Sequence, residues 1–315
     1  MKRRISIFFS QSRILICGFC LFWVLSCTAQ TPVPFDVVFT GNLMSYVTPC
    51  KCPGSPLGGL SRFSTALKNQ QINPETLLIL DTGNFSCPND IHPTEKNERI
   101  LAGFEKLGVK AVSIGYRDLR RPLSELQDLG ARHQIPFVSA NLIDEQTNEH
   151  PFPTYRILNV GKIQTMKVGV IGVVQGGEFR KLSPEIGARL EEPIDAIKRE
   201  LTALEGSVMF TILLTDADRE TIAAWIEQLG EVKIDLILTS SNRTHRQNKV
   251  TIQNIPMFAS GRQGKYLDRI IIRPNNSGAW EIKREDTKLE ESLGDDLEML
   301  HYLKTVTQLL GLDDM

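Results

Sequence analysis

Short apolar runs rich in valine, isoleucine and leucine alternate with amphipathic stretches along most of the chain. The apolar runs predict strands over residues 35–40, 76–81, 111–114, 136–140, 167–174, 208–214 and 234–239. Between them, apolar residues recur at helical spacing and predict helices over 60–68, 95–107, 123–133, 193–204 and 219–229. Several strand runs are continuously apolar, as in strands covered on both faces. The alternation predicts an α/β fold with at least partly parallel sheets.

The pattern changes toward the C-terminus. Hairpin-like strands are predicted over 256–260, 266–273 and 279–283, and a final amphipathic helix over about 295–310. No internal repeat, low-complexity segment or linker divides the chain. We therefore predict one domain over 35–285 and a C-terminal helical segment, 286–315, packed on it.

The first 26 residues have the pattern of a secretory signal. A basic start, Lys2-Arg3-Arg4, precedes an apolar run over 14–25 that is shorter than the roughly 20 residues of a membrane-spanning helix. The sequence Val24-Leu25-Ser26-Cys27 resembles a bacterial lipobox, whose cysteine is lipidated and becomes the mature N-terminus. We predict a signal peptide over 1–26, a lipidated Cys27 and a tether over 27–34. This would place the protein in the bacterial cell envelope or periplasm, anchored to a membrane, with a secreted protein or a retained signal anchor as alternatives.

Composition narrows the function classes. The chain has 315 residues, of which 41% are hydrophobic, and a formal net charge of −1, which excludes wholesale disorder and a multi-span membrane protein. Charge near zero gives no electrostatic footprint for nucleic acid, so no nucleic-acid partner is expected.

The cysteines are concentrated at one end of the chain. All six lie within the first 87 residues: Cys17, Cys20, Cys27, Cys50, Cys52 and Cys87. Removal of the signal leaves three thiols, because Cys27 becomes the lipid attachment point. The last three cysteines follow the first two predicted strands. If those strands are parallel neighbours, the three thiols lie at one edge of the sheet.

The residues after the strands resemble a known family. Phe-Thr-Gly-Asn-Leu-Met at 39–44, Gly-Gly-Leu-Ser-Arg at 58–62 and Leu-Ile-Leu-Asp-Thr-Gly-Asn at 78–84 are similar to the N-terminal half of bacterial 5'-nucleotidases of the calcineurin-like metallophosphoesterase superfamily. The resemblance continues in family order through 107–115, 139–142, 167–172, 234–238 and 261–267. It covers about 35–273 and implies a four-layer α/β/β/α sandwich in a single domain.

The positions that hold two metals in that family carry other residues here. The resemblance places at the family's ligand and catalytic positions Asn42, Met44, Asn84, Tyr116, Arg117, Asp216, Ser241 and Arg243. A two-metal hydrolase needs several anionic or imidazole ligands. The thioether of Met44 suits soft metals, and Arg117 and Arg243 would add positive charge to the site. We therefore expect a degenerate metal site and no cofactor. A divalent metal is expected only under the alternative of a residual phosphoesterase or nucleotidase.

The segment Cys50-Lys51-Cys52 resembles a Cys-x-Cys motif in a branch of nucleotidase-like lipoproteins that has selenoprotein relatives. That resemblance implies thiol redox chemistry with a thiol–disulfide partner protein. The flanking prolines and Gly54 favour the sharp turn that such a pair needs. Lys51 and Arg117 would lower a thiol pKa, and Cys87 would act as the resolving thiol.

Other readings of the same residues stay open. Cys87 would form a structural disulfide with Cys50 or Cys52, or the three thiols would bind a soft metal with Met44 or His92. Another alternative is a non-catalytic binding or scaffold protein that uses the pocket where the family holds its metals. Whether the chain is an enzyme is therefore left open. Asp118, Asp216 and Asp218 are expected to be solvated loop carboxylates.

Overall fold

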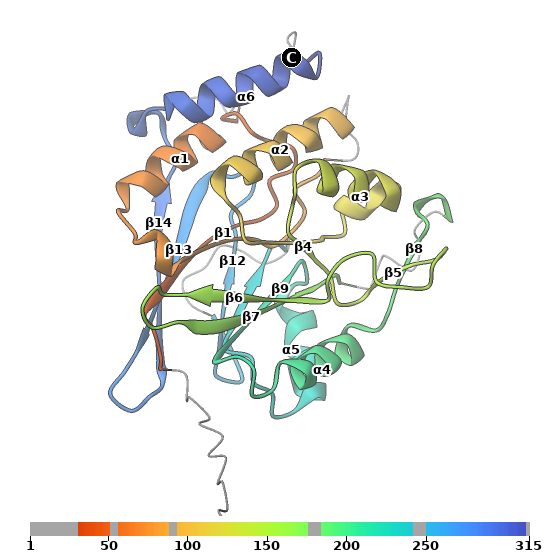
Figure 1. The fold of residues 1–315 in the computed structure, drawn as a ribbon, viewed down its shortest axis with the longest axis vertical. Coiled ribbons are helices and arrows are strands. Elements are labelled where there is room, and N and C mark those ends of the chain that lie inside the picture. The colour runs from red at the N-terminus through yellow and green to blue at the C-terminus, as the bar shows by residue number, and fades with distance from the viewer. Residues whose placement is uncertain (1–30, 51–55, 88–92, 176–183, 242–249, 313–315) are drawn as a thin grey trace, which may run out of the picture.

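The computed structural model describes residues 31–50, 56–87, 93–175, 184–241 and 250–312, and contains two six-stranded sheets packed face to face (Figure 1). The first sheet has the order β14-β13-β1-β2-β3-β4. Its parallel strands are β1 (Phe35–Thr40), β2 (Leu77–Asp81), β3 (Ala111–Ser113) and β4 (Phe137–Val138). An antiparallel hairpin, β13 (Tyr266–Pro274) and β14 (Trp280–Lys288), extends the sheet beside β1.

The second sheet has the order β11-β12-β10-β9-β7-β6. Its parallel strands are β7 (Met166–Val173), β9 (Phe210–Thr215), β10 (Leu236–Thr239) and β12 (Ile255–Ala259). Antiparallel strands β6 (Tyr155–Val160) and β11 (Val250–Ile252) form its two edges. A separate antiparallel pair joins β5 (Leu142–Asp144) to β8 (Ala188–Leu190).

The main core lies between the sheets. Side chains of β1, β7 and β9 interdigitate there, and Phe35 and Phe210 meet edge to face with ring centroids 5.2 Å apart. Every residue of β1, β9 and β10 is buried. Complete burial explains why these strands are almost continuously apolar in sequence.

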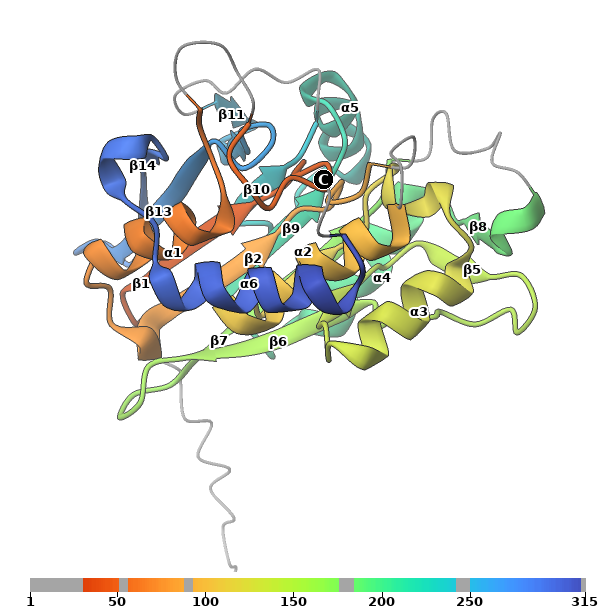
Figure 2. The ribbon, with the colours of Figure 1, turned by 90° about the horizontal axis from the view of Figure 1, so that it is seen from above.

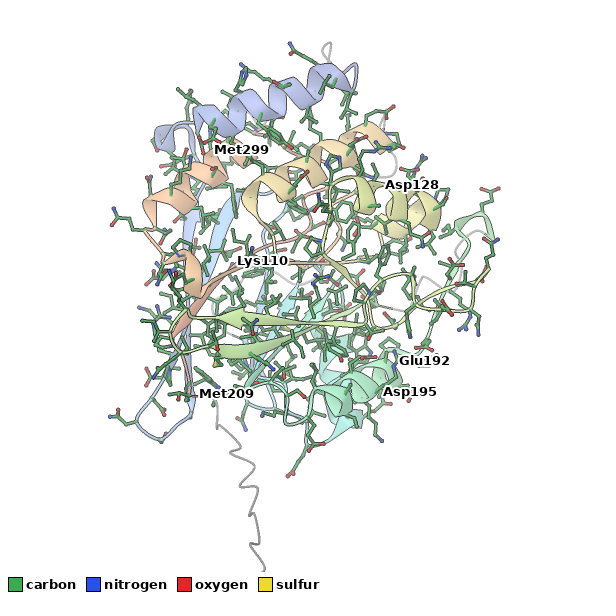
Figure 3. All side chains as sticks on the ribbon, in the orientation of Figure 1. Lys110, Asp128, Glu192, Asp195, Met209 and Met299 are labelled. Carbon is green, nitrogen blue, oxygen red and sulfur yellow. The ribbon has the colours of Figure 1, made fainter. Side chains whose placement is uncertain are left out.

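Helices cover the outer faces of both sheets. The first sheet carries α1 (Leu60–Asn69), α2 (Pro93–Leu107) and α3 (Leu123–Arg132), and the second carries α4 (Pro193–Leu204) and α5 (Arg219–Leu229). The C-terminal helix α6 (Leu297–Leu309) lies across α1 and α2 (Figure 2) and buries Met299, labelled in Figure 3, and Leu303. The predicted α/β/β/α sandwich is thus confirmed. Within the described ranges, no helix has the length and apolarity needed to cross a bilayer.

Differences from the predicted elements have local causes. Strand β6 was not predicted, because it is an edge strand whose residues are mostly half-exposed and polar at intervals. β14 runs to Lys288 rather than 283, since its charged residues pair with β13 along an exposed ribbon. β4 is only two residues long because the chain then leaves the sheet, where the Ser139 N–H donates to the Pro153 carbonyl. The predicted signal peptide and Cys27 lie outside the described residues.

Gly172 allows the two sheets to approach. A Cβ placed on this residue of β7 would lie 2.3 Å from the Val138 carbonyl oxygen and 3.0 Å from the Ser113 hydroxyl. Gly172→Ala should therefore lower the free energy of unfolding by about 1–3 kcal/mol, measured by urea denaturation. Gly169→Ala on the same strand is the matched control. Its Cβ would meet side-chain tips and no backbone, Leu204 at 2.9 Å and Val208 at 3.3 Å, and an equal or larger loss there would contradict the argument.

Candidate functional site

The loops that follow the parallel strands of both sheets meet at one edge of the sandwich. The Tyr116 N–H, after β3, donates to the carboxylate of Asp216, after β9, over 2.6 Å. The Asn84 amide, after β2, donates to the Ser240 hydroxyl, after β10, over 3.3 Å. Since these bonds join the two sheets, residues distant in sequence share one polar site.

The loop after β1 lies against the loop after β2. The backbone N–H groups of Asn42, Met44 and Ser45 donate to the carbonyls of residues 83, 84 and 85 over 2.8, 3.2 and 2.6 Å. The three donors have positive φ angles of 55°, 53° and 63°. Asparagine tolerates this left-handed conformation, but for other residues it costs on the order of 1 kcal/mol or more. The hydrogen bonds to the second loop hold this conformation.

Asn84 ties three segments together. Its backbone N–H donates to Asp118 over 2.7 Å, and its side-chain oxygen accepts from the Arg117 N–H over 2.9 Å. Its side-chain amide reaches Ser240 in the other sheet. The residue is 5% exposed, and both ends of its side chain are used within the protein.

Asp118 is a buried acceptor for backbone N–H groups. One carboxylate oxygen accepts from Asn84 and Gly115 over 2.7 and 2.8 Å, and the other accepts from Ser86 over 2.9 Å. The side chain therefore closes the loops after β2 and β3 onto each other. The prediction of a solvated carboxylate was wrong at Asp118, because these loops pack between two sheets and their N–H groups need internal acceptors.

The two carboxylates after β9 are buried for the same reason. Asp216 accepts from the N–H groups of Tyr116 and Gln175 over 2.6 and 2.7 Å. Asp218 caps α5 by accepting from the Thr221 N–H over 2.9 Å. Both side chains are buried, so the prediction that they are solvated was wrong. Asp216, predicted as a replaced ligand position, is placed at the shared edge, where it bridges the two sheets.

Asp81 was not identified from the sequence. It ends β2, is fully buried, and accepts from the Thr40 hydroxyl over 2.6 Å and from the Gly83 N–H over 2.8 Å. The available signal was an acidic residue that directly ends an apolar strand run. Such a position is buried when the next residue turns back against a neighbouring strand.

Burial raises the pKa of the carboxyl groups of Asp81, Asp118 and Asp216. It raises the pKa of Asp81 to about 7, and those of Asp118 and Asp216 to about 6, from an ordinary 3.8. The N–H donors act in the opposite direction by stabilising the charged forms. Desolvation prevails at each site.

The cysteines are not joined as the structural alternative predicted. Cys50 is 3% exposed and disulfide-bonded, whereas Cys87 is half-buried and carries a free thiol. A disulfide from Cys87 to Cys50 or Cys52 is therefore absent. The Cys87 N–H donates to the hydroxyl of Ser45 over 2.9 Å, which ties Cys87 to the loop that leads to Cys50.

Several residues named from the sequence lie outside the described ranges, among them Cys27, Cys52, His92 and Arg243. The partner of Cys50 is likewise outside them, since Cys87 is the other cysteine that the structure describes.

The remaining predicted positions line the same edge. Met44, Tyr116 and Arg117 are half-buried, and Ser241 is buried. The guanidinium of Arg120 lies 5.4 Å from the centre of the Tyr116 ring, a cation–π distance. These side chains bring an aromatic ring, a thioether and cationic groups to the edge.

Within the part of the chain that the structure describes, no three His, Cys, Asp or Glu side chains are grouped as a metal site would require. Asp118 and Asp216 each direct both carboxylate oxygens at backbone N–H groups. The asparagine at the centre offers an amide whose two ends are engaged. The described donor set therefore does not fit a pair of divalent cations.

Comparison with known proteins identifies the fold. No family model matches the chain. The 5'-nucleotidase of Vibrio vulnificus (strain CMCP6) is 26% identical over 132 residues, which cover 41% of this chain and 23% of that protein. The snake venom 5'-nucleotidase of Gloydius brevicauda is 29% identical over 129 residues, 39% of this chain and 21% of that protein. These matches span less than a quarter of the length of either curated relative.

Solved structures match nearly the whole described chain. The 5'-nucleotidase precursor from Thermus thermophilus superposes with a TM-score of 0.73 at 15% identity, covering 90% of this chain and 60% of that one. The calcineurin-like phosphoesterase YfkN from Bacillus subtilis has a TM-score of 0.71 at 16% identity, covering 88% and 98%. The chain therefore has a 5'-nucleotidase-like, calcineurin-like metallophosphoesterase fold.

The raised pKa values predict how stability depends on pH. Because the native state binds more protons than the unfolded chain between about pH 4 and 7, the free energy of unfolding should fall as pH rises through that interval. In Asp81→Asn this fall should shrink by about 2–4 kcal/mol, because an amide does not titrate in this pH interval. The amide oxygen still supplies the acceptor for the Gly83 N–H. Urea denaturation at several pH values measures it.

Asp128→Asn is the control, because that carboxylate is exposed on α3 (Figure 3). A pH profile of Asp81→Asn that matches the unmutated protein would contradict the assignment of the buried carboxyl.

Proposed function

We propose that this chain is an extracytoplasmic lipoprotein in which the metallophosphoesterase-like fold carries a thiol–disulfide site, Cys50 and Cys52, in place of a two-metal hydrolytic site. The observation that carries the proposal is the state of the described cysteines. Cys50 is disulfide-bonded while Cys87, on the adjacent loop, keeps a free thiol. A disulfide and a thiol on neighbouring loops are the components that exchange requires.

The exchange balances with a partner dithiol as the reductant. A partner thiolate attacks one sulfur of the Cys50–Cys52 disulfide, a mixed disulfide forms, and the other cysteine leaves as a thiolate. The second partner thiolate then displaces the remaining cysteine, so two electrons reach the pair and the partner is oxidised. Because Cys50 is 3% exposed, attack at the Cys52 sulfur is favoured.

Cys87 gives the site a second path. Its thiolate can displace the partner from the mixed disulfide, which rearranges disulfides without net electron transfer. The hydrogen bond between the Cys87 N–H and Ser45 supports this resolving role, since it couples the two cysteine loops.

The polar edge of the sandwich supports the loss of metal chemistry. In a two-metal site, carboxylate and imidazole lone pairs must face the cations. Here the lone pairs of Asp118 and Asp216 accept N–H bonds that hold the loops together. Asn84 at the centre carries no charge. We therefore infer a degenerate metal site, with a non-catalytic binding role for the old pocket as an alternative to redox chemistry.

The N-terminus supports the proposed location. The basic start, the apolar run and the lipobox-like Leu25-Ser26-Cys27 together favour lipid attachment at Cys27. Disulfides persist in extracytoplasmic compartments, so the location and the bonded state of Cys50 agree.

Thiol mapping tests the redox proposal. We expect mass spectrometry of the alkylated mature protein to find Cys50 and Cys52 in one disulfide, opened by dithiothreitol and re-formed by oxidised glutathione, with Cys87 alkylated without reduction. Cys50→Ser and Cys52→Ser should each abolish this reversible state, and Cys87→Ser should retain it. A Cys87 disulfide in the protein before any partner thiol is added, or a disulfide that resists strong reductant in the native protein, would count against a redox pair. The same spectra should show an acylated Cys27 at the N-terminus.

A residual phosphoesterase is the second candidate, favoured by the similarity to two 5'-nucleotidases. We expect no turnover of nucleoside monophosphates or a model phosphoester above background with Mg²⁺ or Mn²⁺. Metal-dependent turnover that is lost in Asn84→Ala or Asp216→Ala would overturn the degenerate-site proposal.

A further inference from the structure

A cavity of about 390 Å³ lies beside the loop that carries Cys50. Its walls come from the start of α1, from α2 and from one side of α6, and its rim includes Thr48 and Pro49. Pro49 is the residue directly before Cys50, so the cavity borders the proposed exchange site. Its volume is within the range of small-ligand sites, about 300–1,000 Å³.

The rim beside Cys50 is held in place by hydrogen bonds. The Cys50 N–H donates to the Leu57 carbonyl over 2.8 Å, and the Leu57 N–H donates to the Cys50 sulfur over 3.5 Å. The Leu60 N–H donates to the Val47 carbonyl over 2.9 Å, where α1 begins. This side of the cavity therefore exists before any partner binds.

The opposite wall, α6, is fixed at its N-terminal end. The Ser61 hydroxyl donates to Asp295 over 2.6 Å, and Lys68 pairs with Asp296 over 2.7 Å. Lys106 on α2 pairs with Glu298 over 2.5 Å. Because α1 and α2 both hold α6, the distance between the helix and the Cys50 loop is set by the fold.

The shape of the cavity suits a short extended peptide. Lining residues on α6 run from Leu300 to Gln308, which spans about 12 Å at the helical rise. An extended chain advances about 3.3 Å per residue, so about four residues match this length. Apolar side chains, Val47, Leu300 and Leu303, form part of the lining and provide surface for a buried side chain.

The charge of the lining favours an acidic ligand. Two cationic side chains, Arg99 and Lys304, line the cavity with one carboxylate, Asp295. Asp295 is already engaged, by the Ser61 hydroxyl and by Arg62 at 3.8 Å. Lys304 is exposed and forms no ion pair with any residue that the structure describes. Its ammonium group is therefore available to a carboxylate on a bound chain.

We infer that this cavity binds an extended, acidic segment of the thiol partner protein and so places the partner's cysteine next to the Cys50 disulfide. The inference rests on the proposed function, because it names the chemistry of the partner recognised at that site. Specificity comes from the ammonium of Lys304 and the apolar wall of α6, while the exchange belongs to the cysteines.

Equilibrium binding tests the cavity separately from the redox chemistry. Two fluorescent five-residue peptides are identical except that one carries two aspartates and the other two lysines, with serine in place of cysteine. The acidic peptide should bind the mature protein about three- to tenfold more tightly at low salt, as expected for partly exposed charge pairs. Lys304→Glu should remove or reverse that preference. Gln308→Trp, which fills the cavity without changing charge, should weaken binding of the acidic peptide.

Lys198→Glu is the matched control. Lys198 lines another cavity, of about 340 Å³, beside α4, on the far helical layer of the sandwich (Figure 1). This variant should keep the preference for the acidic peptide. Equal binding of the two peptides, or an effect of Lys198→Glu as large as that of Lys304→Glu, would overturn the inference.

The cysteine forms of the same peptides connect the cavity to exchange. For each protein, we compare the rate of mixed-disulfide formation with the acidic peptide to the rate with the basic peptide. This ratio should be about three- to tenfold higher in the unmutated protein than in Lys304→Glu. The neutral thiol 2-mercaptoethanol should react equally with both proteins. A disulfide that 2-mercaptoethanol cannot reduce would contradict the proposed function. A disulfide that 2-mercaptoethanol reduces, but that reacts at the same rate with both peptides, would contradict the cavity assignment.

Discussion

The hydrogen bonds that Asp118 accepts determine the arrangement of the whole polar edge. Three backbone N–H groups from the loops after β2 and β3 point at one buried carboxylate. A buried N–H without an acceptor costs about 1–3 kcal/mol, so loss of this carboxylate would release both loops. Asp216 does the same between the sheets, where it joins the loop after β3 to the segment after β7. These acceptors fix Asn84, and through it the first loop and the chain that leads to Cys50.

The apolar pattern of the sequence was sufficient to locate the central strands, and the family resemblance supplied their arrangement in a sandwich. β1, β9 and β10 are buried on every residue, so their apolar runs identify them without regard to their neighbours. Helices such as α4 and α5 were placed to the residue, since each has an apolar face and a start signal, Pro193 in one and the Asp218 cap in the other. Edge strands were less visible, because β6 is half-exposed and its pattern is mixed.

The site could be predicted only in part. The family resemblance placed Asn42, Asn84, Tyr116 and Asp216 at one shared site, and hydrogen bonds join the loops that carry them. The carboxylates were misjudged because a loop position suggests solvent, whereas these loops are enclosed by two sheets. Nothing in the local sequence distinguishes a carboxylate that caps N–H groups from one in water. The difference arises from segments more than thirty residues away, such as the contact of Asp118 with Asn84.

The same hydrogen bonds bear on the chemistry that we propose for this edge. The carboxylate oxygens of Asp118 and Asp216 already accept backbone N–H groups, so a cation would have to share oxygens whose lone pairs are partly used. A disulfide makes no such demand, because sulfur needs few hydrogen bonds and tolerates the burial seen at Cys50. The thiol chemistry that we propose for Cys50 and Cys52 therefore leaves the carboxylates in their structural role. The loop that Asp118 closes also accepts the N–H groups of Met44 and Ser45. These hydrogen bonds hold the left-handed backbone of both residues.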